Sequence, residues 1–336
     1  MENSYRIAGI DVHKSMLAVV VSDVTGKGEW ERRKFGATPS ELRVLADWLR
    51  HREVREAVME STAQYWKPVW QQLEGQCELY LAQAQSNRAP RGRKRDFGDA
   101  ERLLRRHVAG ELILSFVPDP EQRLWRTMTR SRHQLTRDRV RIHSQIESLL
   151  EDGRIKLAGW VSDLLGVSSR RILGALAAGE TEVRKLSALA DPGWRATAEQ
   201  LEDALSGAAQ LSALHRQILG LFLSRLALIE SHLEILDRSI ATALHRCQAA
   251  VQRLAEVPGL GIDSAHQLIA EIGPGAESFA SPQELSSWVD VCPGREESAE
   301  VSKNNRSPKG NRTMRRVLAL AANAAVKAKG SVFHNL

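Results

Sequence analysis

The chain has 336 residues, enough for two or three domains with cores of their own, and 43% hydrophobic with 26% charged residues is an ordinary soluble composition. No stretch approaches the ~18 uninterrupted apolar residues of a membrane helix, and the first residues lack the basic-then-apolar order of a signal peptide, so we expect a cytoplasmic protein with no membrane partner. Three widely spaced cysteines without a CxxC motif argue against a disulfide framework and against a zinc site.

The net charge of +6 is modest, but the basic residues are unevenly distributed. From Ser302 to Leu336 there is no acidic residue, whereas eight lysines and arginines fall in the same segment. Clustered basic residues of this kind are typical of proteins that bind phosphate groups. A solvated helix face is the alternative interpretation.

The first hundred residues alternate between predicted strands and helices. Apolar and β-branched runs predict strands at 7–10 and 17–22, and further strands are expected at 29–35, 55–61 and 77–81. Helices are expected at 40–50 and 65–73. Ser40 is the expected N-cap of the first helix. Three strands, a helix, a strand, a helix and a strand form the order of an RNase H-like sheet, so we predict an α/β domain over residues 1–118.

Four acidic residues fall at the ends of these elements. Asp11 ends the first strand and Glu60 ends the fourth, while Asp96 and Asp99 share one face if a helix begins near Asp96. Turn or capping roles are the plainer interpretation of each acid alone. Together the acids offer four oxygen donors, the ligand type that Mg²⁺ prefers, and paired Mg²⁺ ions can promote phosphoryl transfer. Basic residues just before the pair are expected to hold a nucleic-acid backbone: Arg91, Arg93, Lys94 and Arg95.

Residues 119–247 are predicted to be a helical, coiled-coil region. In 121–150 an apolar stripe is interrupted by arginines, which predicts one packed face and one strongly basic face. The stripe consists of Leu124, Met128, Leu135, Ile142, Ile146 and Leu149, and the arginines expected to bind nucleic acid include Arg130, Arg137 and Arg141. Residues 219–247 carry a heptad seam. Antiparallel pairing with the 121–150 helix and a self-associating coiled coil both satisfy this seam.

Residues 248–336 are predicted to be mainly helical. Val257-Pro258-Gly259-Leu260-Gly261 is typical of a helix-hairpin-helix, in which N–H groups of the turn bind a phosphate, and a plain helix–helix turn is the alternative. Ser298 follows in a polar loop without a nearby histidine that could activate it. The basic stretch after this serine supplies the remaining expected nucleic-acid contacts: Lys309, Asn311, Arg312 and Arg315.

Seven sequence blocks occur in a fixed order along the chain. They are 9–14, 59–62, 92–101, 257–261, 270–273, 292–299 and 309–312. In this order the blocks closely resemble the DEDD transposases of bacterial insertion sequences, relatives of the Piv DNA invertase. The resemblance extends over essentially the whole chain, and an ordered set is far more specific than any one block.

The resemblance implies a fold, a reaction and partners. The fold would be a RuvC-like N-terminal domain with the catalytic, metal-binding tetrad Asp11, Glu60, Asp96 and Asp99, a coiled-coil middle, and a C-terminal transposase domain with Ser298 as nucleophile. The reaction would be RNA-guided recombination of donor and target DNA, with Mg²⁺ as cofactor and a noncoding guide RNA. Tetrad and serine would meet across subunits of a homo-oligomer, a dimer or, on DNA, a tetramer. A RuvC-like metal-dependent nuclease and a non-catalytic nucleic-acid-binding remnant are the alternatives.

The chain departs from the family pattern near the serine. Asp290 stands where the family usually has glycine, and Glu300-Val301 replaces a usual Gly-Lys. Ala63 and Arg95 replace a glycine and a threonine near the acids. An acid beside a phosphate site is unfavourable. Asp290 and Glu300, which flank the Ser298 loop, are therefore the reason to consider a copy that binds nucleic acid but recombines poorly.

Overall fold

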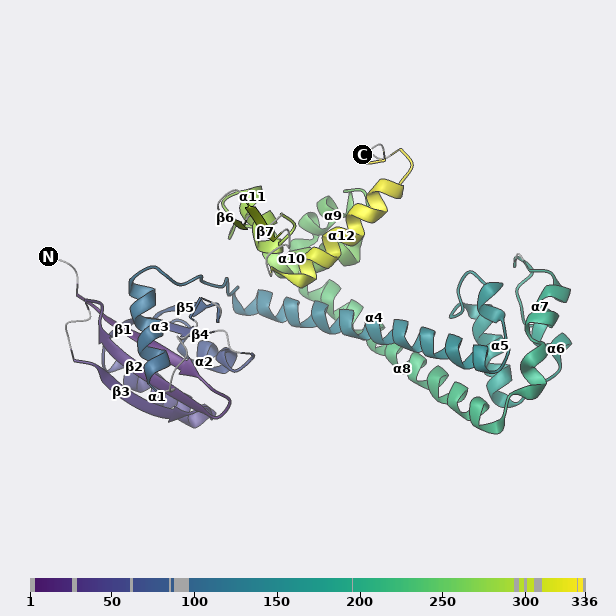
Figure 1. The fold of residues 1–336 in the computed structure, drawn as a ribbon, viewed down its shortest axis with the longest axis horizontal. Helices are drawn as coiled ribbons and strands as arrows, with labels where there is room; N and C mark the ends of the chain where they lie inside the picture. The colour runs from purple at the N-terminus through teal and green to yellow at the C-terminus, as the bar shows by residue number, and fades with distance from the viewer. Residues whose placement is uncertain are drawn as a thin grey trace. The chain divides into compact units, whose positions relative to one another are not determined.

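The computed structural model describes residues 4–25, 29–60, 63–84, 86–87, 97–194, 196–292, 296–298, 301–304, 310–330 and 332–334, with the backbone alone in 296–298 and 301–304. The chain divides into two compact units, Met1–Pro118 and Asp119–Leu336 (Figure 1). Within the described part of the chain, no helix is both long and apolar enough to cross a membrane.

The first unit contains a five-stranded mixed sheet with the strand order β3-β2-β1-β4-β5. Its strands are β1 (Arg6–Val12), β2 (Met16–Asp23), β3 (Glu31–Gly36), β4 (Val54–Glu60) and β5 (Glu78–Ala82). Strand β1 pairs antiparallel with β2 and parallel with β4, β3 is antiparallel to β2, and β5 is parallel to β4. This order and these directions are consistent with the expected RuvC/RNase H-like domain.

Helices cover both faces of this sheet. Helices α1 (Pro39–Arg50) and α2 (Trp66–Leu73) bury their apolar residues against one face, and α3 (Gly98–Val108) lies on the other. The prediction that Ser40 caps α1 is wrong. Thr38 is the N-cap, and its hydroxyl accepts from the amide of Glu41, because Pro39 occupies the first helical position, where its missing N–H costs nothing.

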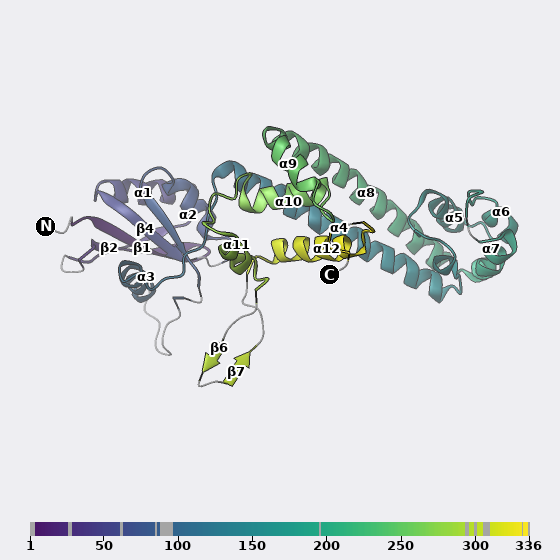
Figure 2. The same ribbon diagram turned by 90° about the horizontal axis from the view of Figure 1, so that it is seen from above.

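Two long helices, α4 (Pro120–Asp152) and α8 (Ala213–Ala243), lie side by side in the second unit (Figures 1 and 2). Ion pairs between Arg132 and Asp237 and between Arg139 and Glu230 show that the two helices run antiparallel, because the partner numbers fall as the first numbers rise. The heptad seam of α8 is buried in this contact through Leu219, Leu226, Ile229 and Ile240. Of the two arrangements that the seam allowed, the pairing within the chain is therefore present.

The predicted apolar stripe of α4 is correct along most of its length but wrong at its start. Leu124 is 56% exposed, whereas Trp125 is buried in a cluster with Ile240, Val251 and Ala265. The packed face begins one residue later because the large indole fills the space between α8 and the C-terminal helices.

Shorter helices complete the second unit. Residues between α4 and α8 form η1 (Leu157–Gly159), α5 (Val167–Ala178), α6 (Val183–Ser187), α7 (Ala198–Ala204) and η2 (Ser206–Gln210). After α8 come η3 (His245–Cys247), α9 (Gln248–Ala255), α10 (Ile262–Ile272), α11 (Pro282–Val289), the two-stranded β6 (Glu296–Ser298) and β7 (Val301–Asn304), and α12 (Arg312–Lys327). Helix α10 packs against both α4 and α12. Its Ala265, Ile269 and Ala270 lie in a cluster with Trp125 of α4, and its Leu268 lies in a second cluster with Met314 and Val317 of α12.

Candidate active site

The alternation of the β-strands places two predicted acids on the same face of the sheet. In β1, Ala8, Ile10 and Val12 belong to the core under α1 and α2, so Asp11 faces the side of α3. In β4, Met59 belongs to that same core, so Glu60 also faces α3. Because Ile10 and Met59 are partners in the parallel β1–β4 register, Asp11 and Glu60 leave neighbouring strands at the same edge.

Helix α3 brings a third acid to this edge. A Cβ atom added to Gly9 would lie 2.3 Å from the carbonyl oxygen of Ala100, so only glycine lets α3 approach β1 this closely. Asp99, in the first turn of α3, thereby comes near Asp11 and Glu60. Burial raises the pKa of Asp11 above its ordinary value, and the charges of Asp99 and Glu60 raise it further, while His13 opposes the shift.

The three described acids are held by polar neighbours. A ring nitrogen of His13 lies 3.1 Å from a carboxylate oxygen of Asp11. The side-chain amide of Asn87 donates to Glu60 at 2.9 Å, and Arg102 donates to Asp99 at 2.5 Å. Arg102 also donates to the side-chain oxygen of Asn87 at 3.3 Å, so one network joins two of the acids.

Neither Asn87 nor Arg102 was predicted from the sequence. Arg102 stands three residues after Asp99, a spacing that places both side chains on one helix face, and this was the available signal. Asn87 carries no such signal, because it lies in a connection between strand and helix and its contact with Glu60 depends on the path of the chain.

The donor set fits a hard divalent cation. Carboxylates at the carboxyl ends of adjacent parallel strands are the oxygen ligands that Mg²⁺ prefers. Burial is the main cause of the raised pKa of Asp11, and the charges of Asp99 and Glu60 add to it. Across the described ranges no group of three acids, histidines or cysteines is already arranged as a metal cluster. The fourth acid, Asp96, lies outside the described residues.

Ser298, the predicted nucleophile, is the last residue of β6, and its backbone pairs with Val301 of β7. The two ends of the segment that contains it, residues 291–310, are held together by hydrogen bonds. The amide of Asn311 donates to the carbonyl of Trp288 at 3.1 Å, and the amide of Gly310 donates to the side chain of Asp290 at 3.3 Å. The end of α11 and the start of α12 therefore form a closed base for the serine segment.

Asp290 is accommodated at the position where the resemblance led us to expect glycine. Its backbone is left-handed, with φ of 72°, and ends α11. Its side chain is fully buried and forms an ion pair with Arg315 of α12. The expected unfavourable charge near the serine is thus neutralised by a partner within the chain, whereas Glu300 lies outside the described residues.

Several residues predicted to bind nucleic acid have partners within the protein. Arg130 pairs with Glu271 of α10, Arg141 pairs with Asp138, and Arg315 pairs with Asp290. Asn311 is the N-cap of α12, Arg312 is the first residue of that helix, and Arg137 is exposed on α4. Five further residues lie outside the described ranges: Arg91, Arg93, Lys94, Arg95 and Lys309.

The predicted helix-hairpin-helix turn joins α9 to α10. Gly259 has a φ of 87° and packs against the backbone of α12, because a Cβ atom added there would lie 2.1 Å from the carbonyl oxygen of Ala321. Gly261 is the N-cap residue of α10, and a Cβ atom there would meet nothing within 4 Å. One side of the turn is therefore covered by α12, and the start of α10 is not.

Two family models match the chain. A model of the DEDD type for IS110 elements, described as a transposase, matches residues 8–154, and a second, described as a transposase of the IS116/IS110/IS902 family, matches residues 251–336. Together they cover well over half of the chain; the first includes all four predicted acids and the second includes Ser298. No curated protein matches it. The chain belongs to the IS110-type DEDD transposase family.

Proposed function

We propose that this transposase recombines DNA by phosphoryl transfer through a covalent bond between Ser298 and DNA, with Asp11, Glu60, Asp96 and Asp99 as the acidic part of the active site. The observation that carries the proposal is the convergence of Asp11, Glu60 and Asp99 at one edge of the sheet. Acids gathered in this way, in a family whose second matched region includes Ser298, favour phosphoryl transfer over binding alone.

The reaction conserves the energy of the phosphodiester bond. The hydroxyl oxygen of Ser298 attacks a DNA phosphate, the Oγ–P bond forms, and the bond from phosphorus to one deoxyribose oxygen breaks. The serine proton is released, and the departing oxygen takes up a proton. Attack by a hydroxyl group of another strand reverses these changes, frees the serine and joins the new strands.

The acidic residues have a role in this reaction as ligands of the cofactor. DEDD nuclease-like domains typically use a divalent metal, and we assign Mg²⁺ to Asp11, Glu60, Asp96 and Asp99. When bound, the ion neutralises negative charge on the phosphate. His13, Asn87 and Arg102 orient the described acids through the contacts given above.

A transposase acts on DNA, and we propose a guide RNA as a second nucleic-acid partner. The basic cluster 91–95 and the arginines of α4 are the residues assigned to RNA, including Arg130, Arg137 and Arg141. Arginine side chains without an aromatic platform suit RNA that is recognised by shape and backbone. We assign DNA binding near Ser298 to the C-terminal region 248–336. Residues 119–247 would serve as a scaffold that connects this region to the N-terminal region 1–118.

The substitution Ser298→Ala tests the proposed nucleophile. A suicide DNA substrate that loses its leaving strand, mixed with full-length protein, guide RNA and Mg²⁺, should trap a covalent protein–DNA adduct with the unmodified chain. Ser298→Ala should reduce the adduct at least 1,000-fold, on the order of the losses seen when an enzyme loses its nucleophile. Asp11→Asn serves as the matched variant in the acidic part and should also prevent trapping.

Other outcomes would favour the alternative functions. An adduct that persists undiminished in Ser298→Ala would reject this serine as the nucleophile. Strand cleavage without rejoining in Ser298→Ala would indicate a RuvC-like nuclease that needs the acids alone. DNA and RNA binding without any cleavage by the unmodified chain would indicate a non-catalytic binding protein, whose affinity should fall steeply with salt.

A further inference from the structure

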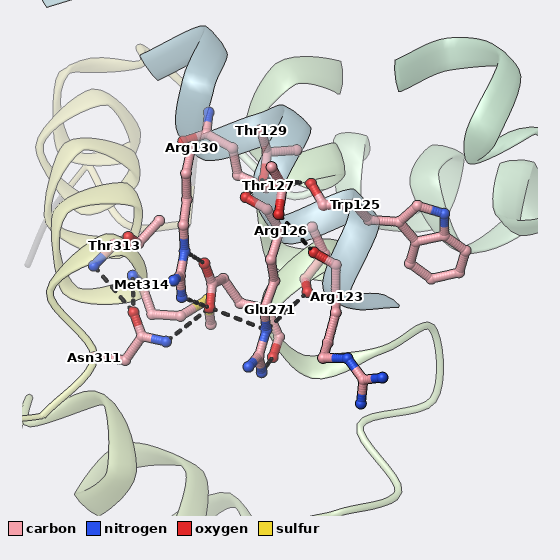
Figure 3. Close-up of polar contacts among 12 residues, drawn as sticks. Arg123, Trp125, Arg126, Thr127, Thr129, Arg130, Glu271, Asn311, Thr313 and Met314 are labelled. Carbon is pink, nitrogen blue, oxygen red and sulfur yellow. Dashed lines mark hydrogen bonds and ion pairs between the residues drawn. The ribbon is translucent and has the colours of Figure 1, made fainter. Parts of the chain in front are cut away.

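Glu271 is a fully buried acid that the proposed reaction does not use. Its side chain, on α10, has 0% exposure. A buried carboxylate is costly unless other groups pair its charge and fill its hydrogen-bonding positions. Arg130 donates to both carboxylate oxygens, at 2.8 and 2.9 Å, and the side-chain amide of Asn311 donates to the second of them at 2.9 Å (Figure 3).

A second arginine of α4, Arg126, also contacts Glu271. A guanidinium nitrogen of Arg126 lies 3.5 Å from the carboxylate of Glu271, and the same side chain donates to the backbone carbonyls of Ala270 and Glu271. Burial lowers the pKa of Arg126 to about 10, while the charge of Glu271 opposes that shift. The buried carboxylate of Glu271 therefore joins α10 to α4 through charged contacts with Arg126, which is mostly buried, and Arg130, which is half exposed.

Asn311 connects this cluster to the serine segment. Its side-chain oxygen caps α12 by accepting from the amides of Thr313 and Met314, at 3.0 and 3.1 Å. Its side-chain nitrogen is then directed toward Glu271, and its backbone amide donates to Trp288. A single residue next to the serine segment is thus fixed by α10, α11 and α12.

We propose that Glu271 is a positioning residue for Ser298, which it serves by fixing Asn311 at the base of segment 291–310. The inference rests on the proposed role of Ser298. Without the bond to Glu271, the cap of α12 remains, but the base of the segment loses its connection to α10 and α4. Small displacements of a reacting group lower the rate of the chemical step by as much as about 100-fold while substrate binding is kept.

The substitution Asn311→Asp separates the two roles of this residue. Aspartate is as good an N-cap as asparagine, so α12 keeps its cap, but the donor to Glu271 becomes a second carboxylate. Asn323→Asp makes the same chemical change at an exposed position of α12, where the side-chain amide donates to the carbonyl of Ala319 in the same helix, and is the control.

Two measurements on full-length protein test whether Glu271 positions Ser298. Asn311→Asp should slow adduct formation on the suicide substrate by about 10- to 100-fold at saturating DNA, with the half-saturating DNA concentration unchanged. Asn323→Asp should react like the unmodified chain. Hydrogen exchange of the Gly310 and Asn311 amides should be faster in Asn311→Asp, while exchange at Thr313 and Met314 stays slow.

The exchange measurement needs no chemistry, so the two proposals can fail separately. A normal rate of adduct formation in Asn311→Asp, or unchanged exchange at Gly310 and Asn311, would overturn the role of Glu271. Absence of an adduct with the unmodified chain would instead reject the proposed function, and exchange alone would then decide whether Glu271 fixes the base of the segment.

Discussion

Asp290 and Arg315 form an ion pair, and the buried charge of Asp290 depends on Arg315 for its neutralisation. The Asp290 side chain has 0% exposure, and its backbone φ of 72° is a conformation that glycine adopts freely and aspartate adopts with modest strain. One carboxylate oxygen accepts from the amide of Gly310 and contacts Arg315. The acid at this glycine position is therefore compatible with the fold because Arg315 neutralises it.

Arg315→Leu should lower the free energy of unfolding by about 3 kcal/mol, since it leaves a buried carboxylate without its charged partner. Asp290→Gly combined with Arg315→Leu should cost clearly less than Arg315→Leu alone, because the buried charge is then absent. Urea unfolding of the four proteins measures the coupling, and a double variant as unstable as the sum of the two single variants would contradict the ion-pair interpretation.

Residues of the candidate site differ in how far the sequence identifies them. Asp11 and Glu60 were predictable because each acid ends an apolar run, and the alternation of a strand then fixes the side it faces. Glu271 was not, since an acid inside an amphipathic helix usually faces solvent, and its partners Arg130 and Asn311 lie 141 and 40 residues away in the chain. The family-like block 270–273 was the signal that could have singled it out.

Among the elements, the turn between α9 and α10 makes a quantitative test possible. Its two glycines have different surroundings: Gly259 is left-handed and presses on the backbone of α12, and Gly261 faces open space at the start of α10. A methyl group at the first position would have to displace α12, whereas one at the second would not. The turn is therefore a packing contact as well as a candidate phosphate site.

We predict that Gly259→Ala lowers the free energy of unfolding by about 3 kcal/mol, from left-handed strain together with overpacking. Gly261→Ala should cost about 1 kcal/mol or less, because alanine is merely a poorer N-cap than glycine. Chemical denaturation of both variants beside the unmodified chain measures the difference. Equal losses would mean that α12 does not lie against Gly259 as described.

Element positions were predicted better than the exact phase of each face. Apolar and β-branched runs located strands such as β1 and β2, and apolar periodicity located the two longest helices, because burial of one helix face imposes a period of 3.6 residues. It misplaced the start of the α4 stripe by one residue, at Leu124 instead of Trp125, and it could not choose a partner for the α8 seam. The phase of the α4 stripe and the partner of the α8 seam both depend on what packs against each helix. The periodicity of a sequence does not reveal that neighbour.

At the scale of the whole molecule, the proposed chemical groups lie in different compact units. Asp11, Glu60 and Asp99 belong to the first unit and Ser298 to the second. If these groups form one active site, as proposed, it requires residues from both units, from one chain or from two, as the proposed homo-oligomer would provide. Since the α8 seam already packs against α4, a dimer contact has to use another surface.

The contact between the α8 seam and α4 can be tested by substitution at Leu233. Leu233 packs against the core between α4 and α8, so Leu233→Asp should lower the free energy of unfolding of the second unit by about 3 kcal/mol, because it buries a charge in an apolar contact. Leu228, on the same helix and 56% exposed, gives the matched variant Leu228→Asp, whose stability should stay within about 0.5 kcal/mol of the unmodified chain. Urea unfolding at two protein concentrations separates folding from association, because a contact within one chain gives a loss that does not depend on concentration. A Leu233→Asp loss that appears only at the higher concentration would place the partner of the seam on a second chain.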